Sequence, residues 1–193
     1  MNHQGDAMEG GRNYGPWKIH TSSEVYRDPW VRVVRDDVTR PDGKPGTYTV
    51  VHIKSGVSVL PIDDDGTTYL TDEFHYAVGR RTLETVSGGI EPAESAEETA
   101  HRELREEIGI EARELIALGT VDPFTASLLS PTQLFLARGL TFVPAAPEGT
   151  EVIRRVAMPF DEAVSLALQG EITHAPSCVL IFRAQAWLKL AHG

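Results

Sequence analysis

One stretch of this 193-residue chain combines a helical repeat of apolar residues with a crowd of acidic ones. Between positions 94 and 108 an apolar residue recurs at every fourth position, namely Ala96, Ala100, Leu104 and Ile108. This spacing places them on one face and predicts a helix over Glu94–Ile108. Gly109 follows directly, at a point where helices commonly stop. This helix is the clearest element that the sequence predicts.

Three carboxylates share one side of the last turns of the predicted helix. Glu103 lies three residues before Glu106 and four before Glu107, so at roughly 100° per residue they face the same way. They stand at the negative end of the helix dipole, and like charges at this spacing repel. A hard divalent cation reverses both penalties. The pattern therefore indicates a metal site; the alternative is a solvated acidic face.

Other residues near these carboxylates are suited to support them. Arg102 lies four residues before Glu106 and can hold its carboxylate by a charged hydrogen bond. Glu94 lies near the same face two turns earlier. The pair Gly88–Gly89 precedes the helix and permits a close backbone approach. A backbone carbonyl in that loop, such as that of Ser87, could reach the same metal.

Charge and composition limit the partners of this chain. Lys and Arg number 18 and Asp and Glu number 28, which gives a formal net charge of -10. Such a chain repels phosphates unless a cation accompanies them, and we expect no nucleic acid partner. No apolar run approaches the roughly 18 residues of a membrane span, so no membrane partner is expected. Because Cys178 is the single cysteine, no intrachain disulfide can form, and a cytoplasmic location is expected.

The length suits one domain with an appended subdomain. Residues 1–15 are polar and Gly-rich and are expected to form a disordered tail. Residues 16–54 are strand-like and predict an N-terminal β-subdomain, and residues 55–193 would form the main domain. The expected strands are Ser22–Val34, Gly46–Ile53, Ser58–Ile62, Thr67–Thr71 and Gln133–Phe142, and the further helices are Asp161–Leu168 and Cys178–Leu190.

The stretch Gly88–Ile110 resembles the signature of the Nudix hydrolases at every defined position. The resemblance implies an α/β fold over 55–193, an α/β/α sandwich with a mixed sheet, after the N-terminal antiparallel β-subdomain. It implies hydrolysis of nucleoside diphosphates linked to another moiety, with magnesium, for which manganese can substitute. It implies metal ligands and orienting partners as follows: Glu103, Glu106, Glu107 and the Ser87 carbonyl as ligands, and Arg102 and Glu94 as partners.

The wider chain resembles one branch of that family, the ADP-ribose and nucleoside-diphosphate-sugar pyrophosphatases. That branch also has an N-terminal β-subdomain and a strand with a glutamate before its glycine loop, as in Leu83–Gly88. The resemblance implies a small-molecule nucleotide substrate, ADP-ribose or a nucleoside-diphosphate sugar. The products would be a nucleoside monophosphate and a sugar phosphate. It also implies a homodimer that exchanges N-terminal strands.

The sequence does not identify a single residue as the general base. In the branch a loop glutamate assists the attacking water, and it would fall near Ser130. The loop Asp122–Pro131 contains no glutamate. Glu106 is therefore the first candidate for the base and Asp122 the second.

Substrate contacts are expected from one arginine and from aromatic rings. The branch commonly has an arginine where this chain has His75, so a substrate-facing arginine would be replaced by Arg80 or Arg81. Trp30 and Tyr26 can stack on a nucleobase, with packing in a β-sheet core as the alternative. The same pair of interpretations applies to Phe124. His174 can contact substrate or cap a helix.

Two further functions compete with the first. The chain can be a Nudix enzyme that acts on dinucleoside polyphosphates or oxidised nucleotides. It can also be a non-catalytic nucleotide-sensing module, because a fold can bind such ligands without turning them over. The intact set of carboxylates favours catalysis.

Overall fold

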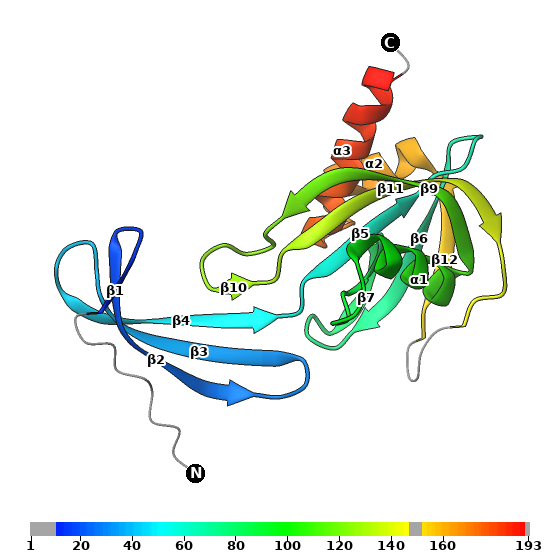
Figure 1. Ribbon diagram of the computed structural model, residues 1–193. Coiled ribbons are helices and arrows are strands. Elements are labelled where there is room, and N and C mark those ends of the chain that lie inside the picture. Colours follow the sequence, from blue (N-terminus) through cyan, green and yellow to red (C-terminus); the bar gives the residue numbers. More distant parts are fainter. Residues whose placement is uncertain (1–10, 147–151, 192–193) are drawn as a thin grey trace. The chain divides into compact units, whose positions relative to one another are not determined.

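The computed structural model describes residues 11–146 and 152–191. The chain divides into two compact units. The first consists of residues up to Lys54 together with Phe124–Ser130, and the second of Ser55–Pro123 together with the residues from Pro131 onward. Figure 1 traces both along the chain. Within the described residues no helix is long and apolar enough to cross a membrane.

The first unit is a five-stranded sheet in the order β1-β2-β3-β4-β10. The first four strands run antiparallel to their neighbours, which confirms the predicted antiparallel β-subdomain. The short β10 joins the far edge, parallel to β4, with Leu128 opposite Val51. The strands are β1 (Arg12–Tyr14), β2 (Trp17–Arg27), β3 (Val31–Thr39), β4 (Pro45–Ile53) and β10 (Leu128–Leu129).

Two expectations for this unit are corrected. The described end of the expected tail, residues 11–15, is ordered: β1 pairs with β2, and Gly15 turns the chain between them with a φ of 57°. Residues 1–10 of that tail lie outside the described residues. The expected strand over Ser22–Val34 is broken into β2 and β3, because the Asp28 carboxylate accepts the backbone N–H groups of Trp30 and Val31 and closes a turn.

The described residues of the second unit form two sheets and three helices. The four-stranded sheet has the order β8-β5-β11-β9 and is mixed, since β5 and β11 run parallel and the other pairs antiparallel. The three-stranded sheet has the order β12-β6-β7 and is antiparallel. The bounds are β5 (Gly56–Pro61), β6 (Thr67–His75), β7 (Arg80–Glu84), β8 (Val86–Gly89), β9 (Ile110–Val121), β11 (Thr132–Phe142), β12 (Arg154–Pro159), α1 (Ala96–Ile108), α2 (Phe160–Gln169) and α3 (Ala175–Ala191).

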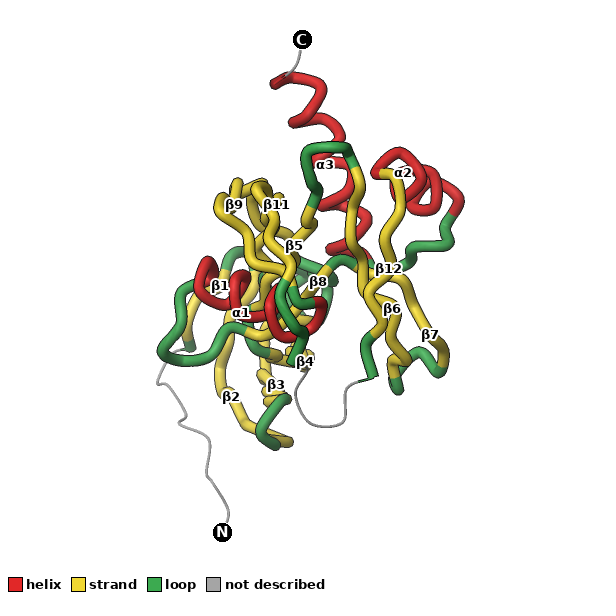
Figure 2. The backbone as a smooth tube through the Cα atoms, turned by 90° about the vertical axis from the view of Figure 1, so that its right-hand side faces the viewer, coloured by secondary structure: helices red, strands yellow, loops and turns green. Residues whose placement is uncertain are grey.

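Helices cover both faces of the four-stranded sheet. Val59 in β5 and Phe135 in β11 belong to a core cluster that also contains Leu104 of α1. The next residues along these strands, Leu60 and Leu136, belong to a second cluster with residues of α2 and α3. Because successive side chains of a strand point to opposite faces, α1 lies on one side of the sheet and the other two helices on the other (Figure 2). The predicted α/β/α sandwich is confirmed.

The sequence around α1 explains where this helix begins and ends. Ser95 is extended and caps the helix: its hydroxyl accepts the backbone N–H of Glu98, whose carboxylate in turn accepts the N–H of Ser95. Gly109 adopts the left-handed conformation, with a φ of 63°, and its N–H bonds back to the carbonyl of Arg105. The capping residue is extended, so the helix starts at Ala96, two residues later than predicted.

The other two helices are longer than predicted. α2 begins at Phe160 and ends where Gly170 becomes left-handed. α3 begins at Ala175, three residues before the predicted start at Cys178. Pro176 lies in its first turn, where a missing backbone N–H costs nothing. The predicted start at Cys178 was therefore wrong by three residues.

Candidate active site

Arg102 is the centre of the acidic group on α1. Its guanidinium donates to both oxygens of Glu94, at 2.9 and 3.1 Å, and to Glu103 Oε1 at 2.7 Å. It also donates to Glu106 Oε2 at 3.1 Å and to the carbonyl of Gly89 at 3.2 Å. One fork-shaped cation thus holds three carboxylates and the glycine loop together.

The charges in this group reinforce one another. The hydrogen bonds from Arg102 to Glu94, together with the neighbouring carboxylates, raise the pKa of Arg102 above its ordinary value. The same hydrogen bonds are the main reason why the pKa of Glu94 lies below its ordinary value. Arg102 therefore stays cationic and Glu94 ionised at neutral pH.

Glu103 is pressed against the glycine loop. Its side chain is only 12% exposed, and a Cβ placed on Gly88 would overlap its carboxylate. Gly88 lies in β8, opposite Val57 of β5, so the glycine is required for α1 to approach this strand. The next residue back, Ser87, was predicted to offer its carbonyl, and it lies in the same strand.

The predicted ligands fit a hard divalent cation by their chemistry. They offer only carboxylate and carbonyl oxygens, and Glu106 and Glu107 are both half-buried on α1. Across the described residues no group of three or more His, Cys, Asp or Glu side chains is drawn together as metal ligands would be. The guanidinium of Arg102 lies among the carboxylates instead. The pocket that adjoins this helix is lined by Arg102 and Glu106 and has a volume of about 570 Å³, which lies within the range of small-molecule sites.

The second candidate for the base and the aromatic candidates lie outside this group. Asp122 is exposed at the end of β9. Trp30 and Phe124 belong to the first unit and are 71% and 57% exposed. Tyr26 is exposed as well and donates to Asp28. Packing in a sheet core, the alternative for these rings, is therefore wrong, whereas their stacking on a base stays a prediction.

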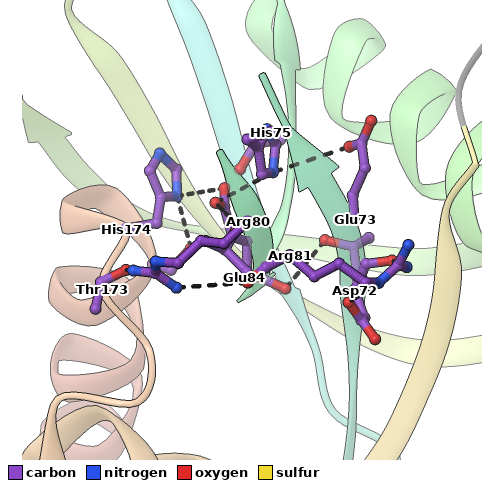
Figure 3. Close-up of polar contacts among 12 residues, drawn as sticks. Asp72, Glu73, His75, Arg80, Arg81, Glu84, Thr173 and His174 are labelled. Atoms are coloured by element: carbon purple, nitrogen blue, oxygen red, sulfur yellow. Dashed lines mark hydrogen bonds and ion pairs between the residues drawn. The ribbon is translucent and has the colours of Figure 1, made fainter. Parts of the chain in front are cut away.

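The two candidate arginines on β7 differ in their partners. Arg81 is held by Asp72, at 2.8 Å from its Nε to Oδ1. Arg80 donates to the hydroxyl of Thr173 at 2.7 Å. Both contacts are visible in Figure 3. Since a carboxylate neutralises Arg81, Arg80 is the better placed of the two to meet an anion.

A polar cluster around Glu84 was not predicted from the sequence (Figure 3). This carboxylate is 13% exposed and lies 3.2 Å from His75 Nε2 and 3.0 Å from His174 Nδ1. Thr82 donates to it at 2.6 Å. Burial lowers the pKa of His174, and the opposing charge of Glu84 only partly offsets this effect. The sequence comparison with the family already drew attention to Glu84 and to His75. The spacing of these residues along the chain gave no sign that His174 lies beside them.

Comparisons with known proteins identify the family of this chain. A family model described as the NUDIX domain matches residues 52–177, and one described as the nucleoside diphosphate sugar hydrolase N-terminal domain matches residues 17–51. An ADP-ribose pyrophosphatase of Mycobacterium tuberculosis is 32% identical over 145 residues, which is 73% of this chain and 70% of that protein. An ADP-ribose pyrophosphatase of Bacillus subtilis is 26% identical over 172 residues, 85% of this chain and 90% of that protein.

A solved structure supports the fold independently. The crystal structure of an ADP compounds hydrolase superposes with a TM-score of 0.81 over 94% of this chain and 98% of that one, at 22% identity. The NUDIX model matches well over half of the chain and ends just after Pro176, within the second unit. The chain therefore belongs to the Nudix family and is a pyrophosphohydrolase of that family.

Proposed function

We propose that this chain hydrolyses the pyrophosphate bond of ADP-ribose or of a nucleoside-diphosphate sugar, with magnesium, to a nucleoside monophosphate and a sugar phosphate. The observation that carries the proposal is the convergence of Glu94, Glu103 and Glu106 on Arg102 beside the glycine loop. The substrate class is supported by the N-terminal model, whose description names nucleoside diphosphate sugars, and by the two relatives named ADP-ribose pyrophosphatases.

Magnesium would be held by Glu103, Glu106, Glu107 and the Ser87 carbonyl. When bound, such a cation neutralises charge on the diphosphate and lowers the pKa of coordinated water. A protein of net charge -10 otherwise repels a doubly or triply negative substrate. The need for a cation therefore follows from the charge as well as from the ligand set.

The chain's own residues supply positioning and a base. Arg102 holds three carboxylates in place, and its hydrogen bond to Glu106 Oε2 fixes the position of that carboxylate. Glu106 is the proposed general base for the attacking water, and exposed Asp122 is the second choice. Arg80 is the proposed contact to a substrate phosphate. Base stacking by Trp30 or Phe124, the homodimer and the cytoplasmic location stay predictions.

A substrate panel at fixed magnesium tests the proposal. The panel contains ADP-ribose, ADP-glucose, GDP-mannose, UDP-glucose, a diadenosine polyphosphate and dGTP, and products are separated by anion-exchange chromatography. We expect fastest hydrolysis of ADP-ribose or of one sugar nucleotide, loss of activity with EDTA, and recovery with added magnesium. Preferential cleavage of the diadenosine polyphosphate or of a nucleoside triphosphate would replace the proposed substrate class. Tight ADP-ribose binding without products would identify a sensing module.

A further inference from the structure

A chain of buried hydroxyl groups connects the Glu84 cluster to the glycine loop. His174 Nδ1 lies 2.8 Å from Ser177 Oγ, and Ser177 Oγ lies 2.9 Å from Thr85 Oγ1. Thr85 Oγ1 in turn lies 2.5 Å from Ser58 Oγ. Ser177, Thr85 and Ser58 are completely buried. Buried polar groups destabilise a fold unless their hydrogen bonds are made. We therefore expect each hydroxyl of this hydroxyl chain to have a fixed hydrogen-bond partner.

Within this hydroxyl chain, each group donates its hydrogen to the next one, from His174 toward Ser58. A carboxylate accepts hydrogen bonds, so the 3.0 Å contact between Glu84 and His174 favours the tautomer with the proton on Nδ1. Ser177 Oγ then accepts from Nδ1 and also from the backbone N–H of Thr85, at 3.0 Å. Its own hydrogen is left for Thr85 Oγ1, and Thr85 must donate to Ser58. The tautomer of His174 therefore orders every hydroxyl as far as Ser58.

The hydroxyl chain ends at Ser58 in β5, next to strand β8, which carries the predicted metal ligand Ser87. Thr85 joins β7 to β8, and so links the three-stranded to the four-stranded sheet. Ser58 lies opposite Ser87 in the pairing of β5 with β8. Ser87 donates to the carbonyl of Thr85 at 2.9 Å, and its hydroxyl lies 3.4 Å from Ser58 Oγ. The hydroxyl of Ser87 thus contacts two members of the hydroxyl chain, Thr85 and Ser58, and Ser58 is also the residue opposite Ser87 in the strand pairing.

The same residues cannot work as a nucleophilic triad. In such a triad the serine and the acid meet different ring nitrogens. Here Ser177 and Glu84 both meet Nδ1 of His174. Ser177 is completely buried, so no substrate reaches it. A supporting role fits the geometry better than a catalytic one.

We propose that His174 is a positioning residue: held by Glu84, it orders the Ser177–Thr85–Ser58 hydroxyls and thereby sets the backbone of Ser87 for cation binding. This inference rests on the proposed function, because it assigns a supporting shell to the metal site of that function. Such outer partners orient ligands in known metal sites, and their loss commonly weakens metal binding by 10–100-fold, a typical range.

Two variants at one position separate hydrogen bonding from packing. His174→Leu keeps an apolar body but has no donor, whereas His174→Asn keeps an N–H close to the position of Nδ1. His20→Ala serves as a matched control, because His20 is an exposed histidine whose side chain contacts Thr39 in the first unit. The first readout is metal-free: the amide resonances of Ser87 and Gly88 in a ¹H–¹⁵N spectrum, with the tautomer of His174 read from its ring ¹⁵N shifts. The second is the affinity for Mn²⁺ alone, measured by electron paramagnetic resonance.

We expect wild-type His174 to carry its proton on Nδ1. His174→Leu should shift the Ser87 and Gly88 resonances and weaken Mn²⁺ binding about tenfold or more. His174→Asn should keep the resonances and the Mn²⁺ affinity close to those of the wild type. His20→Ala should change neither the resonances nor the affinity. Equal losses in His174→Leu and His174→Asn would show that only ring packing matters and overturn the inference. Normal Mn²⁺ binding by His174→Leu would overturn this inference but not the proposed function. Absence of Mn²⁺ binding by the wild-type protein would overturn both.

Discussion

The carboxylate of Glu103 lies against the backbone of Gly88, in the space that any side chain at position 88 would fill. This contact brings the acidic turn of α1 next to β8. No positive φ is found at Gly88, so its requirement comes from close approach rather than from backbone conformation.

Replacement of Gly88 by alanine tests this contact. The added Cβ must displace Glu103, so we expect a free energy of unfolding lower by about 1–3 kcal/mol, the usual cost of overpacking, and a large loss of magnesium-dependent hydrolysis. Urea unfolding and initial rates measure the two effects. Gly46→Ala is the matched control, since a Cβ there meets only the flexible side chain of Arg40. Full activity in Gly88→Ala would contradict the close approach.

Replacement of Glu107 by glutamine tests the ligand assignment. The amide keeps the size of the side chain but removes the charge that a cation needs, so turnover should fall by at least about 100-fold, since losses in the outer shell alone can reach that size. The thermal midpoint of the metal-free protein should stay within a few degrees. Glu97→Gln, an exposed residue of the same helix, should keep its activity. Equal activity in the two variants would remove Glu107 from the site.

The region around α1 could be predicted because its information is local. Each of its features depends on residues that are at most four positions apart: the apolar repeat, the glycine after Ile108 and the Arg102–Glu106 pair. Helical geometry alone brings such residues together. The burial of Leu104 and the contact from Arg102 to Glu106 both follow from this spacing. The signature then identifies the fold of the second unit.

The Glu84 cluster could not be predicted in this way. His75 and Glu84 come from the paired strands β6 and β7 but are not opposite each other in their register, and His174 comes from a segment 90 residues after Glu84, just before α3. No local spacing records such a contact. Strand β1 escaped prediction for a different reason: its three residues, Arg12–Tyr14, are all exposed and show no alternation of apolar and polar side chains.

Acid stability should depend on Asp72. Hydrogen bonds from Arg154 and then from Arg81 hold the pKa of this carboxyl below its ordinary value, against the effect of burial. Its folded-state pKa is depressed, so its contribution to stability is present above the unfolded-state pKa, about 3.9, and is lost as the pH falls through the folded-state value. Asp72→Asn should therefore lower the free energy of unfolding at pH 7 and flatten its fall in acid. Asp64→Asn, whose side chain is 96% exposed, should follow wild type. A wild-type acid profile in Asp72→Asn would refute this role.

Arg102→Lys should damage both stability and activity although it conserves the charge. Lysine presents one compact ammonium, which cannot donate at once to Glu94, Glu103, Glu106 and the carbonyl of Gly89 as the guanidinium does. Hydrogen bonds to charged groups contribute about 1.5–3 kcal/mol each, and Arg102 is mostly buried, so the loss of several should lower the free energy of unfolding by about 2 kcal/mol or more. Denaturant unfolding measures this loss, and turnover at saturating magnesium should fall with it. Arg105→Lys, one turn later on the exposed face with a single 3.8 Å ion pair to Glu111, should leave both nearly unchanged. Equal behaviour of the two lysine variants would mean that Arg102 acts only as a charge and does not hold the carboxylates in place.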